Sequence, residues 1–289
     1  MQHEIINDYS AESDEQVFQI ANAAYLDYNG LANPRARSIE GDVPESADLV
    51  DDELGNWYTY NYGAHASFFV LDTRAARSSN YAPDDEFKTM LGARQKQALF
   101  DWLDAVNETV TFKFVVSSVP LMSLWTYGED TWAGFITERS QVLDKLQYVP
   151  NVIVLSGDRH EFAAASLRKT ITEFSTSPFN QFYLPVRTLS QNNAVPGDDL
   201  LLKYIPDGNH KFTLFTVDTR VPLDPRVYVQ LVVDDEVAWN VTYHGKPVRR
   251  LAGTPASRAG GGGSTARKAL GALRHTLAEL LAFTRFKWF

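Results

Sequence analysis

The residues best suited to chemistry follow a short apolar segment in the middle of the chain. Residues 152–155 read Val-Ile-Val-Leu and are followed by Ser-Gly-Asp-Arg-His at 156–160. A buried strand ending there would place these side chains at the carboxyl end of a sheet, where open α/β sheets bind ligands. Asp158 and His160 offer an oxygen and a nitrogen donor that a metal cation accepts. Taken alone, the segment fits equally well a strand-ending turn in which Asp158 caps a backbone amide.

Three further segments carry polar side chains in suggestive positions. Residues 3–8, His-Glu-Ile-Ile-Asn-Asp, hold four groups with lone pairs, although a segment at the start of a chain is usually frayed. Residues 117–120, Ser-Ser-Val-Pro, place two hydroxyls after an apolar run and are by themselves only a strand end. Arg74, two residues after Asp72, could bind phosphate bidentately, or it could pair with Asp72, which is the default expectation.

Composition excludes several classes of site and protein. The 289 residues are 44% hydrophobic and contain no cysteine, which excludes disulfides, zinc ribbons, iron–sulfur clusters and thiol nucleophiles from a globular chain. The net charge is −9, and the six Lys or Arg residues beyond residue 250 make the preceding part more acidic still. An acidic body argues against nucleic-acid binding, which needs cations against the phosphate backbone. It is compatible with a site that collects metal cations.

No run of roughly 18 apolar residues predicts a transmembrane helix, and the first residues lack the basic and apolar regions of a signal peptide. We interpret residues 251–264 as a Gly-rich linker and residues 265–289 as a basic amphipathic helix. That helix has two alternative roles: peripheral contact with an anionic membrane, or docking of its leucine stripe on the protein's own body. The sequence does not indicate the cellular compartment.

The elements that would position these residues alternate along the chain. Helical spacing of apolar residues predicts helices over 13–28, 93–106 and 135–146. Strands are expected at 57–62, 67–71, 112–116 and 152–155, and the order strand, helix, buried strand from 112 to 155 indicates a parallel βαβ unit in an α/β fold. The C-terminal part differs, with antiparallel strands expected at 212–217, 227–233 and 237–243.

Taken together, these segments resemble the alkaline phosphatase D (PhoD-like) family of metallophosphatases over roughly residues 3–248. The matching motifs, in the order that the family has them, are His3-Glu4 with Asn7-Asp8, Phe68-Phe69-Val70-Leu71-Asp72-Thr73-Arg74, Trp132-Ala133-Gly134-Phe135 with Glu138-Arg139, and Ser156-Gly157-Asp158-Arg159-His160. The resemblance implies a calcineurin-like layered α/β sandwich over residues 1–250, of which this chain holds the C-terminal portion, with antiparallel C-terminal strands and a terminal helix.

The resemblance also implies an activity. Members would be metal-dependent phosphoric ester hydrolases of the alkaline phosphatase or phosphodiesterase type, in which a metal-activated hydroxide attacks phosphorus. His3 would be catalytic, Asp158 and His160 would be metal ligands, and Arg74 and Trp132 would lie near the phosphoester substrate. The cofactors implied are divalent or trivalent ions in a multinuclear centre, with Ca and Fe as the family's metals.

This sequence departs from the family pattern at three places. The two metal-binding loops that precede the His loop elsewhere in the superfamily have no counterpart before Met1. Gln2 stands where the family has a bridging Asp, and Ser118 stands where an intermediate loop has a metal-binding His. We therefore expect a truncated hydrolase that is short of metal ligands. The alternative is a non-catalytic remnant that serves as a binding or regulatory module.

Overall fold

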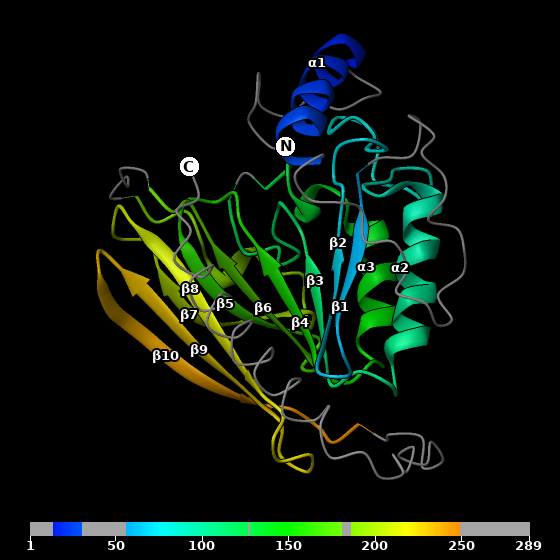
Figure 1. Cartoon of the computed structure of the whole chain (residues 1–289). Helices are drawn as coiled ribbons and strands as arrows, with labels where there is room; N and C mark the ends of the chain where they lie inside the picture. The colour runs from blue at the N-terminus through cyan, green and yellow to red at the C-terminus, as the bar shows by residue number, and fades with distance from the viewer. Residues whose placement is uncertain (1–13, 31–55, 127, 181–185, 249–289) are drawn as a thin grey trace. The chain divides into compact units, whose positions relative to one another are not determined.

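The structure, a computed structural model, describes residues 14–30, 56–126, 128–180 and 186–248 (Figure 1). His3, the linker expected at 251–264 and the helix expected at 265–289 lie outside these ranges. Within the described residues, no helix is long and apolar enough to cross a membrane.

A seven-stranded mixed sheet forms the centre of the fold. Its strands are ordered β1-β2-β3-β4-β6-β5-β7. Their bounds are β1 Tyr58–Tyr62, β2 Ala66–Val70, β3 Phe112–Val116, β4 Val152–Ser156, β5 Phe162–Leu167, β6 Ile171–Thr176 and β7 Asp199–Ile205. The four strands β2, β3, β4 and β6 are mutually parallel, whereas β1, β5 and β7 pair with their neighbours in antiparallel fashion.

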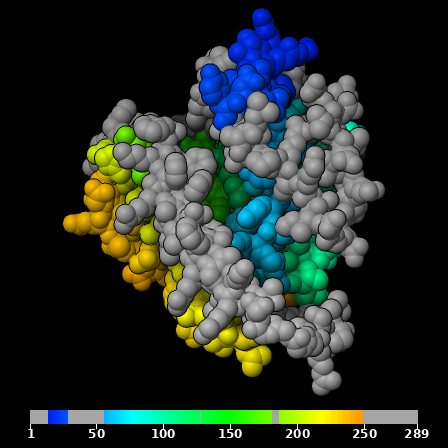
Figure 2. Space-filling model, viewed as in Figure 1, coloured from blue at the N-terminus to red at the C-terminus, as the bar shows by residue number. Residues whose placement is uncertain are grey.

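A second, three-stranded antiparallel sheet has the order β10-β9-β8. Its strands are β8 Lys211–Asp218, β9 Arg226–Val233 and β10 Glu236–His244, drawn in yellow and orange in Figures 1 and 2. Asp234 and Asp235, which join β9 to β10, have φ of 46° and 70°. A two-residue hairpin turn of this hand needs positive φ at both positions, and Asp tolerates that conformation. The antiparallel C-terminal strands expected from sequence are confirmed.

The helices are α1 Glu15–Tyr25, α2 Gly92–Val106 and α3 Ile136–Leu146. A π-helical turn, Leu26–Gly30, continues α1, and short 3₁₀ turns cover Trp132–Gly134 and Gln191–Asn193. Both α2 and α3 bury an apolar stripe, as the helical spacing predicts. Because α3 connects the parallel strands β3 and β4, the predicted βαβ unit is confirmed.

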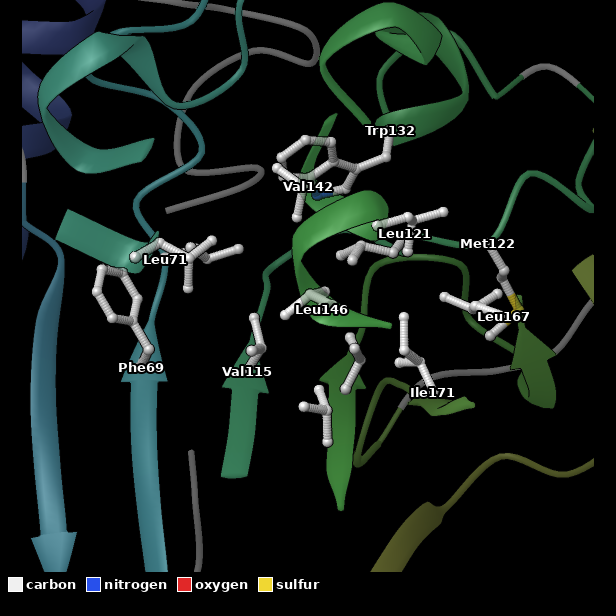
Figure 3. Packing of buried hydrophobic residues seen from close by; sticks show 14 of the residues in the cluster. Phe69, Leu71, Val115, Leu121, Met122, Trp132, Val142, Leu146, Leu167 and Ile171 are labelled. Carbon is white, nitrogen blue, oxygen red and sulfur yellow. The ribbon is translucent and has the colours of Figure 1, made fainter. Parts of the chain in front are cut away.

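The main sheet has an apolar core on each face. One core joins the sheet to α2 and α3 and contains Val115, Leu146 and Trp132 (Figure 3). The other joins it to β8–β10 and contains Phe112 and Phe114, whose side chains alternate with that of Val115 along β3. Sheet and helices thus form a layered α/β sandwich, which confirms the predicted fold class.

Candidate active site

The carboxyl ends of the four parallel strands lie at one edge of the main sheet. Because β2, β3, β4 and β6 are parallel neighbours, the residues that follow each of them lie along that edge. The Thr73 and Ser118 hydroxyls, which follow β2 and β3, are hydrogen-bonded at 2.5 Å. Between β4 and β6, the Ser175 hydroxyl donates to the Gly157 carbonyl at 3.3 Å. Polar contacts therefore join the ends of β2 and β3, and those of β4 and β6, along this edge.

Asp158 and His160, the two predicted metal ligands, lie in the loop that leaves β4 at this edge. Asp158 has φ of 77° and His160 has φ of 60°, so both occupy the left-handed region that non-glycine residues seldom adopt. The backbone N–H of His160 donates to the Ser177 hydroxyl at 3.3 Å, which ties the loop to the end of β6. The Asp158 side chain is half-buried and that of His160 is exposed. Such backbone strain is typical of functional loops.

Arg74 lies after β2, where the sequence predicted it, but its guanidinium is only 1% exposed. It donates to both carboxylate oxygens of Asp130, at 3.1 and 3.3 Å, and Arg77 binds the same carboxylate. Asp72 instead accepts hydrogen bonds from backbone N–H groups, among them that of Arg74 at 2.8 Å. The default pairing of Arg74 with Asp72 is therefore replaced by pairing with Asp130, and a contact of Arg74 with substrate stays a prediction.

Trp132, the other residue expected near the substrate, is fully buried. Its indole packs in the core between the main sheet and α3 (Figure 3). The indole N–H donates to the Ser117 hydroxyl at 3.3 Å, directly after β3. Trp132 thus contacts the segment that directly follows β3, and a direct role toward substrate stays a prediction.

A buried carboxylate that the sequence reasoning missed organises the loop after β3. Glu173, on β6, accepts the backbone N–H groups of Leu121 and Met122 at 2.8 and 2.6 Å and the Ser156 hydroxyl at 2.6 Å. Burial raises the pKa of Glu173 to about 7, although these hydrogen bonds oppose the shift. Glu173 thereby joins the loop after β3 to the last residue of β4.

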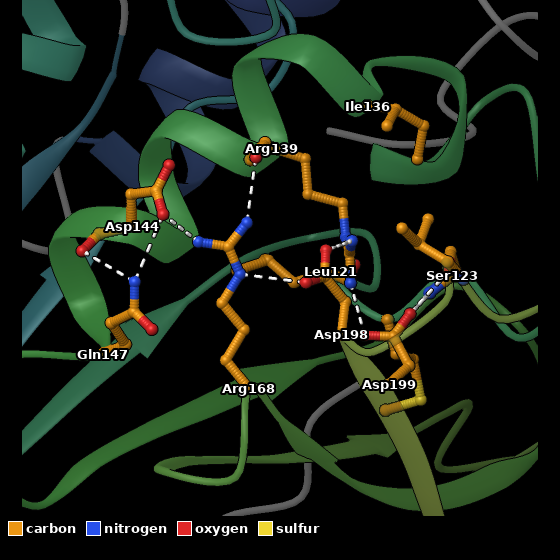
Figure 4. A network of polar contacts seen from close by, with 12 residues as sticks. Leu121, Ser123, Ile136, Arg139, Asp144, Gln147, Arg168, Asp198 and Asp199 are labelled. Carbon is orange, nitrogen blue, oxygen red and sulfur yellow. Dashed lines mark hydrogen bonds and ion pairs between the residues drawn. The ribbon is translucent and has the colours of Figure 1, made fainter.

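An ion-pair network holds the same loop from the α3 side (Figure 4). Arg139, fully buried, donates to the Leu121 carbonyl and pairs with Asp198 and Asp199. Asp199 also accepts the backbone N–H of Ser123 at 2.9 Å. The loop that faces the Asp158–His160 segment is therefore fixed by buried charges rather than by apolar contacts alone.

Glu161, the residue after His160, is a third buried carboxylate. It accepts hydrogen bonds from Trp125, Thr188 and Tyr204, which come from three separate segments. The sequence showed Glu161 beside the candidate loop but offered no reason to assign it a role, since its donors lie 27 to 43 residues away.

The donor set for a metal ion is incomplete within the described ranges. No three His, Cys, Asp or Glu side chains there gather closely enough to hold a metal ion. Asp158 and His160 are of the right chemical types but number only two. His3, the predicted catalytic residue, lies outside the described residues.

Comparisons with known proteins identify what this architecture resembles. The family described as PhoD-like phosphatase matches residues 2–224. Alkaline phosphatase D of Bacillus subtilis strain 168 is 28% identical over 218 residues, which cover 66% of this chain and 35% of that protein. The chain therefore spans about a third of the length of this curated relative.

Solved structures give the fold. A structure entitled "Structure of PhoD" superimposes with a TM-score of 0.57 at 19% identity, covering 89% of this chain and 55% of the other. A dimetal phosphatase from Danio rerio gives a TM-score of 0.42 at 12% identity, covering 68% of this chain and 62% of the other. The first match confirms the metallophosphatase-type fold expected from sequence.

Proposed function

The chain belongs to the PhoD-like phosphatase family, and on this premise we propose that it is a metal-dependent phosphoric ester hydrolase. The single observation that carries the proposal is the family match across residues 2–224, which includes the Asp158–His160 loop at the carboxyl edge of four parallel strands. We propose phosphate monoesters or diesters as the substrate class.

Asp158 and His160 are the described residues that would hold a metal ion in this proposal. A bound divalent ion supplies positive charge for phosphoryl oxygens and lowers the pKa of water. A metal ion at this edge would need further ligands besides these two, because the described residues hold no group of three potential ligands. His3 is proposed, from the resemblance alone, to protonate the leaving oxygen or to stabilise the transition state.

The chain's own contacts support a rigid site. The edge hydroxyls Thr73 and Ser118 bond each other, and the loop after β3 is held by Glu173 and Arg139. Positioning of this kind reduces the reorganisation that a reaction needs when charge develops. The proposed role of the scaffold is therefore to hold the loops that follow β3 and β4 in fixed positions while substrate binds at this edge of the sheet.

The test uses the whole purified chain with a chromogenic phosphate monoester and a diester, with added metal ions and then with a chelator. We expect chelator-sensitive hydrolysis. His160→Ala should lower kcat/KM by at least about 100-fold, because losing an outer-shell partner already costs about 10- to 100-fold. The matched control is His244→Ala, since His244 is exposed on β10 and pairs with Asp224. That control should retain wild-type kcat/KM.

Other outcomes decide between the two hypotheses for this chain. A folded sample that binds no metal and turns over neither ester would contradict the proposal and favour a non-catalytic binding module. Turnover that survives both the chelator and His160→Ala would show that hydrolysis comes from some other site or a contaminating enzyme.

A further inference from the structure

We propose that β10 pairs in antiparallel fashion with β10 of a second copy of this chain, so that two three-stranded sheets join into one six-stranded sheet. This inference goes beyond the proposed function, because the surface belongs to the smaller sheet and includes none of the candidate site residues. The partner is a second copy because β10 is complementary to itself when one strand is reversed against the other.

The outer side of β10 has no partner strand among the described residues. β10 is the last strand of its sheet, in the order β10-β9-β8, and pairs only with β9 (Figure 1). With nine residues, it is the longest of the described strands. A strand in this position presents a row of backbone N–H and C=O groups that can pair with another chain.

β10 lacks most of the features by which exposed sheet edges avoid such pairing. Proline, lysine, short length and bulges are the usual ones. The sequence of β10 contains neither proline nor lysine, whereas the edge strand β7 carries Lys203 and the edge strand β1 has only five residues. A β-bulge lies between Val237 and Trp239, but the register with β9 is regular from Trp239 to His244. This regular stretch is available for pairing.

The two ends of β10 carry opposite charges. Asp234 and Asp235 form the turn before it, whereas His244 is its last residue and the exposed Lys246 follows. Antiparallel pairing about a twofold axis at Asn240 places the acidic turn of one copy beside the basic end of the other. A parallel arrangement would instead place like charges together, which is destabilising. The strand is therefore self-complementary, as a twofold interface requires.

Neighbouring charges leave these signs unchanged. The cation at the acidic end is His210, which pairs with one of the two aspartates, and the exposed Glu236 adds a further negative charge. At the basic end, Asp224 is matched by Arg226, so that Lys246 keeps this end positive. The charge complementarity thus survives when the adjacent ion pairs are counted.

The pairing would also cover apolar side chains that β10 exposes. Val237 is 55% exposed and Val241 is 36% exposed. The axis at Asn240 places Val241 of one copy opposite the half-buried Trp239 of the other, within the contact distance of directly opposite side chains. A single strand from each chain is smaller than the standard interface of about 800 Å² per partner, so we expect a reversible dimer with a micromolar Kd.

The test measures the molar mass of the whole purified chain by sedimentation equilibrium over a range of concentrations. We expect a monomer–dimer equilibrium. Asn240→Lys places two ammonium groups opposite each other at the axis and should raise the dimer Kd by about fivefold. Gln230→Lys is the matched control, because Gln230 is the neighbour of Asn240 on β9 and is exposed on the same face, one strand away from the edge. It should leave the dimer Kd unchanged.

A mixing experiment separates pairing from general loss of folding. Asn240→Glu should weaken self-association for the same reason as Asn240→Lys, because two carboxylates then face each other. A mixture of the two variant chains should recover at least the wild-type affinity, since opposite charges meet at the axis. Misfolded chains would not recover on mixing, so this recovery reports on the pairing itself.

Amide hydrogen exchange locates the contact. Exchange in β10 should slow as the concentration of wild type rises through the dimer Kd, whereas exchange in β3, which is central in the main sheet, should not change. In Asn240→Lys the slowing in β10 should appear only at higher concentration.

The remaining outcomes overturn the inference. A wild-type chain that is monomeric at every concentration does so, and slow exchange of β10 in that monomer would show that the edge is covered within the chain. A dimer that Asn240→Lys leaves unchanged, or a mixture that does not recover, also overturns it. Hydrolysis of the two esters is measured separately, so the proposed function can fail while the dimer stands, or stand while the dimer fails.

Discussion

At the scale of single residues, the buried Glu173 makes stability depend on pH. Its pKa rises from 4.5 to about 7 on folding, mainly through desolvation. Between these values the folded chain keeps a proton that the unfolded chain releases, so the free energy of unfolding falls as pH rises. The stabilisation that protonated Glu173 gives the folded chain is fully present below pH 4.5 and is lost by about pH 7. It amounts to about 3 kcal/mol.

Glu173→Gln should therefore remove this part of the pH dependence. We expect the difference in unfolding free energy between about pH 5 and about pH 8 to shrink by about 3 kcal/mol relative to wild type. Urea unfolding at several pH values measures this difference in wild type and in the variant. Glu236→Gln is the control, because Glu236 is exposed at the start of β10. An unchanged pH slope in Glu173→Gln would show that folding does not raise the pKa of this carboxyl.

The position of Asp158 and His160 at the end of a strand was predicted correctly from sequence, and their role as metal ligands stays a prediction. Asp158 and His160 follow a four-residue apolar run and a glycine, so their place at a strand end could be read directly. Glu173 and Glu161 could not be found in this way, because a glutamate inside or beside a strand normally indicates an exposed face. Their donors come from segments distant in sequence, and only the folded chain brings them together.

At the scale of elements, the strands and helices with regular patterns were predicted to within a few residues. The strand at 112–116 and the helix at 93–106 are examples, since each shows a clear apolar spacing. Strands β5, β6 and β7 were missed. β5 reads Phe-Ala-Ala-Ala-Ser-Leu, in which alanine has low β propensity, and β6 carries Glu173 at a buried position. Tertiary contacts, rather than local preference, determine β5 and β6.

The Arg139 network should contribute strongly to stability because it is buried. Arg139→Met keeps much of the side-chain volume but leaves Asp199, which is fully buried, without its cation. We expect the free energy of unfolding to fall by about 3–5 kcal/mol, the usual cost of removing one partner of a buried pair. Denaturant unfolding followed by circular dichroism measures this loss.

Lys145→Met on the same helix is the matched control. Lys145 pairs with Asp104 at 2.6 Å, but these side chains are 30% and 64% exposed. Solvent screening limits such a pair to about 1 kcal/mol or less. Equal losses in the two variants would contradict the view that Arg139 fixes the loop after β3 through a buried network.

At the scale of the described sandwich, β6 connects its two cores. Glu173 faces the loop after β3, and the next residue, Phe174, faces β8–β10. The ring of Phe174 packs edge-on against that of Phe215, with 5.4 Å between the ring centroids. The ring centroids of Phe162 and Trp239, in the same interface, are 5.5 Å apart. Because one strand contributes to both cores, we expect the two sheets to unfold together.

Phe174→Ala tests this coupling. Phe174 is 2% exposed, so its truncation should lower the free energy of unfolding by about 3–5 kcal/mol. Tyr228→Ala, on the outer face of β9, should change it by only about 0.5 kcal/mol. Tryptophan fluorescence reports on both cores, through Trp102 and Trp132 in one and Trp239 in the other, and far-ultraviolet circular dichroism reports on the backbone. If the sheets are coupled, both signals give one coincident transition in wild type and in Phe174→Ala. A second transition in Phe174→Ala would mean that β8–β10 can separate while the sheet carrying the candidate site stays folded.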